Sequence, residues 1–367
     1  MKHLVEFALH SRLLVTVLAM LLMAAGYWSY TKLPVDAFPD VSPNLVQVFT
    51  ITEGLAPEEI EKYVTFPVET SMNGLPGVDN IRSVSNFGLS VVNVYFEDGM
   101  DLYFCRQLVG ERLNEAREAI PDGFGEPEMG PISTGMGLVL FYYLDDTTGQ
   151  YSLSELRSIQ DWVIKFNLQN VPGVTEVLGI GGFEKQFHVE VDPLSLERYG
   201  FTVAEVIERI EDNNLNIGAQ FIERNNEEYV VRSVGLATSL EDIRSILMGS
   251  SDGTPITVGD VAEVKEGAAF RRGLQSKNGA SEVVAGQVIK LFGTNASTVI
   301  QAVEEKIVQI NTSLPDGVHI VPYYEQKTLV GAAVGTVTSA LTQGIVLVAL
   351  VLIIFMGGLR PTIVVAI

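Results

Sequence analysis

Two uncharged, strongly apolar stretches near the two ends of the chain constrain its architecture more than any other feature. Residues 13–30 and 336–356 contain no Asp, Glu, Lys or Arg. Each is about as long as the ~20 residues that an α-helix needs to cross the hydrocarbon core of a bilayer. The segment between them has ordinary globular composition. We therefore predict two transmembrane helices that flank a large domain outside the membrane.

Basic residues near these stretches predict their orientation. Lys2 and Arg12 precede the first stretch, and Arg360 follows the second. Lys and Arg close to the ends of membrane helices favour the cytoplasmic side, so the amino terminus is expected inside and residues 31–335 outside. The aromatic cluster at 27–30 fits a membrane interface. Since no small-residue cleavage site is evident, an uncleaved anchor is favoured over a signal peptide.

A third apolar run begins shortly after the second stretch. Residues 357–361 read Gly-Gly-Leu-Arg-Pro, and residues 362–367 are apolar again. A run this short cannot span a bilayer. We therefore expect the sequence to be the amino-terminal part of a longer, multi-pass membrane protein.

The charge and cysteine content narrow the class of protein. The formal net charge is −21, and most of the acidic residues lie in the outer segment. Recognition of nucleic acid requires a basic surface, so we expect no nucleic-acid partner. The single cysteine, Cys105, excludes an internal disulfide framework. Its place in the apolar-periodic stretch 102–113 predicts a buried core thiol.

The outer segment contains one structural unit twice. Residues 66–88 and 163–182 each run from a helix through Pro-Gly-Val into a strand, and Pro-Asp-Gly follows a later helix in both copies. Pro and Gly at these places stop helices and form turns. Each copy, 45–124 and 138–323, is predicted to have the β-α-β-β-α-β order of a ferredoxin-like fold. The predicted elements include a helix over 57–72, a helix over 101–119 capped by Asp101 and a strand over 282–291.

The second copy is interrupted by an insert, residues 183–281. It contains a predicted helix, residues 203–213, and a predicted hairpin, residues 219–234, around Asn225 and Asn226. Asn tolerates the positive φ that tight hairpin turns require. The repeated fold does not need this insert, and segments of this kind usually serve a contact.

Several longer segments resemble one family of transporters. They are LPVDAFPDVS (33–42), VTFPVET (64–70), FEDGMDLYFCRQLVGERL (96–113), MGPISTGMG (129–137), LRSIQDW (156–162), KQFHVEVDP (185–193) and FRRG (270–273). Together with the order of spans and repeats, they are similar to the resistance-nodulation-division (RND) efflux pumps. Among these pumps, the sequences of the segments resemble those of the heavy-metal-efflux, Cus/Czc-type inner-membrane subunit. This chain would be an amino-terminal fragment of such a subunit.

The resemblance implies a function and a set of partners. It implies an α+β membrane protein that is no enzyme but a secondary active transporter, a proton antiporter in the bacterial inner (cytoplasmic) membrane. It implies a homotrimer in the lipid bilayer, with a periplasmic membrane-fusion adaptor and an outer-membrane channel. No cofactor is implied beyond the transported metal ion and protons. Neither apolar stretch has a carboxylate for proton coupling, so the fragment alone is expected to be inactive.

The resemblance also implies a division into domains, with two periplasmic pore subdomains of the ferredoxin-like type and a docking insert in the second. The expected parts are residues 1–32 (amino-terminal segment and first transmembrane helix), 33–130 (first pore subdomain), 131–182 and 282–330 (second pore subdomain), 183–281 (docking insert), 331–357 (second transmembrane helix) and 358–367 (start of a third).

Candidate residues for a substrate path lie first in the connector between the copies. Met129 and Met136 flank its Gly-rich sequence GPISTG. Thioether sulfur suits Cu(I), whereas a methionine that only fills a gap in the core is the more common case. The four histidines show no metal-ligand spacing, so the metal ligands stay unknown.

The FRRG segment supplies the other candidates, Phe270, Arg271 and Arg272. The resemblance implies Met at position 270 in pumps for monovalent metals, and a phenyl ring cannot ligate copper. It also implies Glu at position 138 in many pumps for divalent metals, where this chain has Leu138. With Met replaced at position 270, we favour divalent cations over Cu(I) and Ag(I).

The predicted hairpin is the candidate trimer contact. Phe221 and Tyr229 supply apolar side chains, and Asn225 and Asn226 the turn. A two-stranded ribbon is marginally stable by itself in water. We therefore expect an adjacent subunit to hold it.

Two other functions compete with metal export. One is an RND pump of the same architecture for organic or drug substrates. The other is a two-span periplasmic ligand sensor, which would continue into a charged cytoplasmic helix. The chain instead turns apolar directly after Arg360, which disfavours a sensor.

Overall fold

The computed structural model describes residues 12–32, 42–52, 54–216, 218–224, 227–232, 235–251, 253–271 and 273–357. The expected third span at 358–367, Arg272, Asn225 and Asn226 lie outside the described residues. The chain forms two compact units. One comprises Met1–Tyr143, Lys165–Leu178 and Gly286–Ile367, and the other Leu144–Ile164 and Gly179–Ala285.

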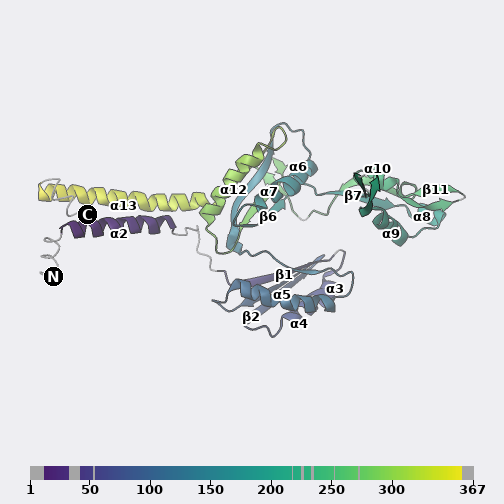
Figure 1. Cartoon of the computed structure of the whole chain (residues 1–367), viewed down its shortest axis with the longest axis horizontal. Helices are drawn as coiled ribbons and strands as arrows, with labels where there is room; N and C mark the ends of the chain where they lie inside the picture. Colours follow the sequence, from purple (N-terminus) through teal and green to yellow (C-terminus); the bar gives the residue numbers. More distant parts are fainter. Residues whose placement is uncertain are drawn as a thin grey trace. The chain divides into compact units, whose positions relative to one another are not determined.

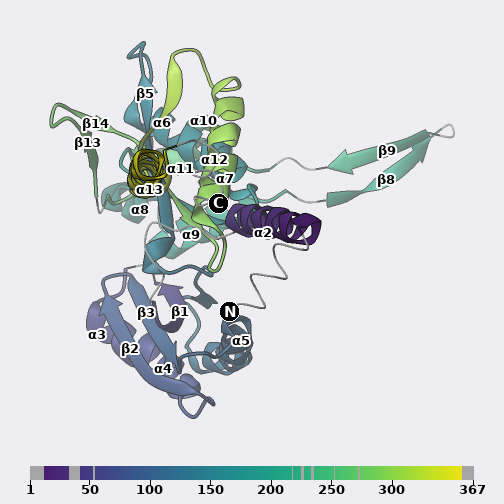
Figure 2. The same cartoon turned by 90° about the vertical axis from the view of Figure 1, so that its left-hand side faces the viewer.

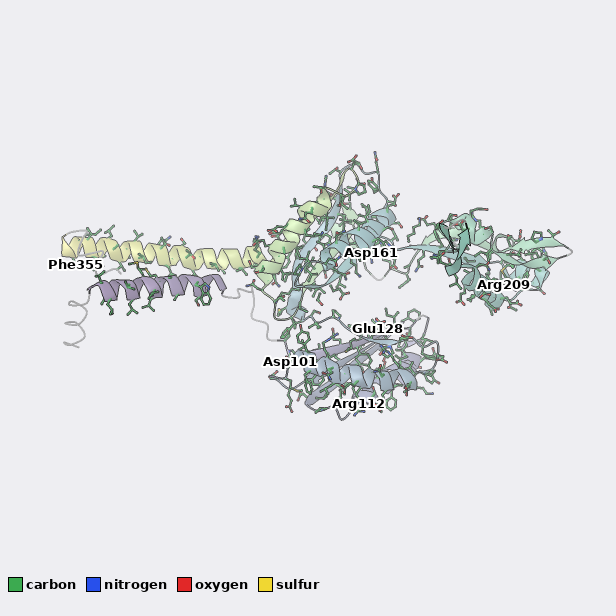
Figure 3. All side chains as sticks on the ribbon, in the orientation of Figure 1. Asp101, Arg112, Glu128, Asp161, Arg209 and Phe355 are labelled. Carbon is green, nitrogen blue, oxygen red and sulfur yellow. The ribbon has the colours of Figure 1, made fainter. Side chains whose placement is uncertain are left out.

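Two apolar helices lie near the ends of the chain. Helix α13 (Gln326–Met356) is long and apolar enough to cross a membrane over Gln326–Phe355. Its apolar side chains are exposed, as at Phe355 at its far end (Figure 3). Helix α2 (Arg12–Lys32) carries a shorter apolar helix, Leu13–Gly26. Among the described residues, α13 is the one helix with the length and hydropathy of a span, and a second span stays a prediction.

The first of the two α/β repeats, residues 44–129, is built on a four-stranded sheet (Figure 1). It is called the first repeat below. The strands are β1 (Asn44–Ile51), β2 (Val78–Asn86), β3 (Leu89–Phe96) and β4 (Pro127–Met129), in the order β2-β3-β1-β4. Strand β1 pairs antiparallel with β3 and β4, and β2 pairs antiparallel with β3. Alternate residues of β3 are buried, because successive side chains of a strand point to opposite faces.

Two helical segments pack on the first sheet. They are the continuous run α3 (Pro57–Ile60), π-helical η1 (Glu61–Thr65) and α4 (Phe66–Met72), and helix α5 (Leu102–Ala119). The first run matches the helix predicted over 57–72. The carboxylate of Asp101 caps α5 by accepting a hydrogen bond from the backbone N–H of Phe104 at 2.9 Å, as predicted. Cys105 is 0% exposed in the core between helices and sheet, so the predicted buried thiol is confirmed.

The second repeat (residues 138–180 and 285–325) has a sheet with the same strand order. Its strands are β5 (Leu138–Asp146), β6 (Val174–Ile180), β15 (Ala285–Lys290) and β16 (Val318–Glu325), in the order β16-β5-β15-β6. Counted along each repeat, both sheets run fourth, first, third, second. The helices are α6 (Leu153–Ile159), π-helical η3 (Gln160–Ile164), α7 (Lys165–Gln169) and α12 (Ala296–Asn311).

Close packing in the second repeat depends on one glycine in β15. Tyr142 is fully buried in β5, and a Cβ on Gly286 would lie 2.1 Å from its Cζ atom. Only a residue without a Cβ leaves room for this ring, since cores are packed as densely as organic crystals.

The insert folds around a core of its own, with Val206, Val258 and Val264 among its buried residues. Its main strand pair is β7 (Lys185–Val191) with β12 (Ala262–Ala268), antiparallel. The other elements are α8 (Pro193–Tyr199), α9 (Val203–Asn213), α10 (Leu240–Arg244), β10 (Leu247–Ser251), β11 (Thr254–Thr257), α11 (Val258–Val261), β13 (Gln275–Lys277) and β14 (Ser281–Val283). Helix α9 has the bounds that the sequence predicts.

The predicted hairpin is present as strands β8 (Gly218–Arg224) and β9 (Glu227–Arg232), a two-stranded ribbon (Figure 2). The register pairs Phe221 with Val230 and Ile222 with Tyr229. Phe221 and Tyr229 therefore belong to neighbouring pairs of the ladder. The role of Phe221 and Tyr229 in a trimer contact stays a prediction.

Three element assignments from the sequence differ from the structure. Strand β4 lies beyond the predicted first copy, residues 45–124. It was not predicted because three residues are too few to show the alternation of a strand. The strand expected over 282–291 is two strands, β14 and β15, with Val284 between them. Helices α8, α10 and α11 were not expected, since four to seven residues give no helical period.

Candidate substrate cleft at the root of the insert

A cleft of about 400 Å³ lies where the insert leaves and rejoins the second repeat. Its walls are formed by the end of β6, the glycines that follow it, and Phe270, Arg271 and Gly273. The lining residues are Arg157, Gly179, Ile180, Gly181, Gly182, Glu184, Ala269, Phe270, Arg271 and Gly273. The structure thus brings the predicted residues Phe270 and Arg271 together with a glycine turn that the sequence analysis did not assign to a site.

Arg157 of α6 fixes one wall. Its Nε atom donates to Oδ2 of Asp161 at 2.6 Å, and its Nη1 donates to the backbone oxygen of Gly181 at 2.9 Å. Asp161, labelled in Figure 3, lies one helical turn after Arg157, the spacing at which helix side chains meet. Both side chains are largely buried, and their opposite charges neutralise each other in this ion pair.

The glycine turn needs residues without side chains. Gly181 and Gly182 have φ of +76° and +69°, a region that L-residues rarely adopt. A Cβ on Gly182 would lie 2.7 Å from Val284 Cγ2 and 2.8 Å from the backbone oxygen of Leu153. The turn therefore brings the backbone of β6 close to α6 and to the chain that returns from the insert.

Arg271 fixes the opposite wall. It forms an ion pair with Glu282, and its guanidinium carbon lies 4.6 Å from the ring centroid of Phe183, within the range of a cation–π contact. The neighbouring Phe270 is 88% exposed. A phenyl ring at this rim can take part in apolar or cation–π contacts but has no lone pair for a metal.

Two carboxylates beside this cleft are paired with arginine side chains. Asp161 and Glu282 are each held by an arginine. Within the described ranges, no three His, Cys, Asp or Glu side chains gather in a way that could hold a metal ion. The described residues of the cleft therefore supply no set of ligands for tight metal binding.

The two methionines of the connector have different surroundings. Met129 ends β4 and packs against the core of the first repeat; its Cε lies 3.4 Å from where a Cβ on Gly110 would stand. Met136 lies in the 3-10 turn η2 (Gly135–Gly137) and is 41% exposed. Met129 therefore packs in a gap of the core, and Met136 is the more exposed of the two.

Leu138 lines another cavity, of about 450 Å³. The polar lining side chains carry amide or hydroxyl groups and no charge: Ser42, Asn44, Gln47, Tyr95, Ser133 and Thr134. Without the expected Glu at position 138, this wall offers neutral oxygen atoms and apolar carbon.

An aromatic cluster on the second repeat was missed by the sequence analysis. The ring centroid of Phe141 lies 4.9 Å from that of Tyr324 and 6.0 Å from that of Tyr323, and Tyr143 lies 6.3 Å from Tyr323. Burial raises the pKa of the Tyr323 hydroxyl. The alternation of aromatic residues at 141 and 143 in β5 was the available signal.

The whole chain matches a known family. The model described as the AcrB/AcrD/AcrF family covers residues 4–367. The chain belongs to this family. The predicted RND resemblance is thus confirmed.

Two similar relatives of this AcrB/AcrD/AcrF member are named as cation efflux proteins. It is 42% identical over 372 residues to "Cation efflux system protein CzcA" of Alcaligenes sp. (strain CT14), covering 100% of this chain and 35% of the relative. It is 39% identical over 355 residues to "Cation efflux system protein CusA" of Escherichia coli (strain K12), covering 96% and 34%. The chain therefore spans about a third of the length of the curated relatives that it matches.

Solved structures give the same result. The crystal structure of a heavy metal efflux pump (crystal form II) superposes on this α+β chain with a TM-score of 0.88 at 33% identity, covering 99% of this chain and 36% of the other. The second crystal form gives 0.87. The heavy-metal-efflux branch is thus supported by sequence and by fold.

Proposed function

We propose that this chain is the amino-terminal part of a proton-driven RND transporter that exports heavy-metal cations, with divalent cations favoured. The observation that carries the proposal is the match over the whole chain to relatives named as cation efflux proteins, together with the fold of a heavy metal efflux pump. Such a protein is an antiporter rather than an enzyme, and its substrates are metal ions and protons.

The proposal assigns a place in the cell to each part. Both α2 and α13 cross the bacterial inner membrane in a multi-pass subunit, and the two repeats with the insert lie in the periplasm. The same strand order in the two sheets supports two subdomains of one β-α-β-β-α-β type. The domain limits predicted from the sequence are kept as part of this proposal. A reporter fused at Gly149 should behave as exported, and cytoplasmic behaviour would refute this topology.

The partners in this proposal are a homotrimer, a periplasmic adaptor and an outer-membrane channel. The β8–β9 ribbon is the proposed docking element, with Phe221 and Tyr229 in its strands and Asn225 and Asn226 at its turn. An isolated ribbon of two strands is marginally stable, and this supports a role in which another subunit holds it.

The divalent preference rests on the rim of the cleft. Phe270 stands where the resemblance implies a Cu(I)-ligating methionine, and soft cations select thioether ligands. Phe270 has no sulfur, and Met136 is the more exposed methionine of the connector. The described residues therefore offer few thioether ligands for a copper path.

Transport of organic molecules is the second candidate, favoured by one observation. The rings of Phe141, Tyr143, Tyr323 and Tyr324 cluster within 4.9–6.3 Å of one another in successive pairs. Aromatic side chains line many sites for small organic molecules. Most of the surface of these four rings is apolar carbon, which does not ligate a metal ion.

The test is resistance of an efflux-deficient bacterial host that expresses the full-length gene. We expect higher tolerance of zinc, cobalt, nickel or cadmium, with little for copper or silver. Phe270→Met should raise copper tolerance, whereas Phe187→Met, on β7 away from the cleft, should not. Tolerance of copper and silver alone contradicts the divalent preference, and tolerance of detergents or drugs alone supports the second candidate.

A further inference from the structure

The base of helix α13 is fastened to the second repeat by a buried amide. Gln326, its first residue, is 7% exposed. Its Nε2 atom donates to the backbone oxygens of Leu138 at 2.9 Å and Met136 at 3.3 Å. A buried amide that lost these acceptors would leave polar groups unsatisfied, which is unfavourable away from water. The start of α13 is therefore fixed to the segment that enters β5.

The next residue supplies a second fastening, to α12. Lys327 Nζ lies 2.8 Å from Oε2 of Glu304. The two side chains are 42% and 32% exposed, so water screens this pair in part. Together the two fastenings tie α13 to both a strand and a helix of the second repeat.

A second carboxyl group competes for the same lysine. Glu325 ends β16 directly before α13 and is half-buried. Burial, the negative charge of Glu304 and a hydrogen bond between the two carboxyl groups raise the pKa of Glu325, while Lys327 lowers it. These are the charged groups that act on Glu325: Glu304 from α12 and Lys327 from α13. On its own strand, Tyr323 is a neighbouring titratable group and is neutral in this pH range.

We propose that Glu304 and Glu325 hold one proton between them and form, with Gln326 and Lys327, a proton-sensitive joint between α13 and the second repeat. With the proton bound, one carboxylate faces one ammonium and the cluster is neutral. Without it, two carboxylates face each other beside a single cation. Like charges this close repel strongly where water is partly excluded.

The direction of the effect follows from linkage. A carboxyl group binds its proton more tightly in the closed joint than in an open one, since its pKa is raised there. The closed joint is therefore favoured as the pH falls and weakened as the pH rises through that raised pKa. Protonation at this place changes how firmly α13 is held, whether or not a metal is being transported.

The test measures the joint itself, as a distance between spin labels at Gln301 of α12 and Leu329 of α13 in the full-length protein in lipid nanodiscs. Both positions are exposed. We expect a short distance at acid pH that gives way to longer distances as the pH rises, with a midpoint above the ordinary value for Glu. Glu325→Gln should remove this pH dependence.

Two further variants separate a proton-linked joint from a merely structural contact. Glu304→Gln removes a repelling charge and should lower the midpoint, whereas Lys327→Met removes an attracting charge and should raise it. Glu305→Gln, an exposed neighbour on α12, is the matched control and should leave the midpoint unchanged. A distance independent of pH, or the same direction of shift in Glu304→Gln and Lys327→Met, would overturn the proposal.

Discussion

The two repeats share one strand order but differ at the link between their second and third strands. In the first repeat, β2 and β3 are joined by a tight turn, in which Asn86 pairs with Leu89 and Gly88 has a φ of +71°. In the second, the chain leaves at Ile180 and returns to the sheet at Ala285, and β6 and β15 are still neighbours. The sheet thus does not depend on a short connection there. A hairpin turn at a sheet end is where this fold accepts a large insert.

The repeats also differ where their first helices begin. Pro76 and Pro172 belong to the two Pro-Gly-Val turns, and Ala56 and Ser152 are separated by the same number of residues. Ala56 and Ser152 therefore occupy equivalent positions directly before the first helix of each repeat. Ser152 Oγ accepts a hydrogen bond from the backbone N–H of Glu155 at 3.2 Å. Ala56 has no side-chain acceptor and keeps only the return bond from its own N–H to Glu59, at 3.3 Å. The second repeat thus has a complete capping box and the first has half of one.

The largest expected effect is on the packing that only the second repeat requires. Gly286→Ala places a methyl group 2.1 Å from Tyr142 Cζ, and overpacking of this kind costs about 3 kcal/mol. We expect amide hydrogen exchange in β5, β15 and β16 to accelerate while β1–β3 keep their protection. Gly135→Ala, with open space around the site, is the control. Equal effects of the two changes would show that the packing is not specific.

The next effect concerns the root of the insert. Arg271→Met removes the partner of Glu282, whose side chain is 23% exposed, and should cost about 1 kcal/mol. Faster proteolysis between residues 269 and 283 would show local loosening. The control is Arg112→Met in the first repeat, since Arg112 and Glu115 are 42% and 61% exposed and their pair contributes little. If both changes act alike, the insert is not fastened by Arg271.

An exchange of caps should bring the two repeats closer in stability. Ser152→Ala removes a side-chain acceptor and should destabilise the second repeat by about 1 kcal/mol. Ala56→Ser should stabilise the first by about 0.5 kcal/mol for the same reason. Denaturant titrations followed by hydrogen exchange in each repeat would measure both. A loss of stability in Ala56→Ser would contradict the equivalence of the two positions.

The smallest effect is a pH dependence confined to the second repeat. Hydrogen bonds from the Thr148 hydroxyl and the Tyr151 and Gly149 N–H groups lower the pKa of Asp146 to about 2. The ionised carboxylate therefore stabilises the turn fully at pH values above the ordinary Asp pKa of about 3.9. This stabilisation is lost as the pH falls through about 2. Amide shifts of residues 148–151 should follow this titration and lose it in Asp146→Asn. Thr50, at the equivalent place in the first repeat, cannot titrate. A midpoint near the ordinary value would refute the assignment.

Periodicity and turn residues predicted most of the fold. The Pro-Gly-Val turns, the Asp101 cap and the alternation in β3 each act through neighbours in the chain, so their effects are visible in the sequence. The apolar length of α13 and the buried place of Cys105 follow from the same patterns.

The site was less predictable because its contacts join distant segments. Phe270 and Arg271 were identified by resemblance. Arg157 and Gly182 line the cleft, and Glu282 pairs with Arg271, only when α6, β6 and the returning strand meet. The short helices of the insert and β4 give no period of their own.

The central claim is export of divalent metal, and direct transport tests it best. The full-length protein would be reconstituted in lipid vesicles, and movement of Zn²⁺, Co²⁺ and Cd²⁺ would be followed with a proton gradient and without one. The account predicts transport of at least one of these ions that requires the gradient and that Cu(I) does not match. Gradient-driven transport of Cu(I) or of organic molecules, with none of the divalent ions, would contradict it.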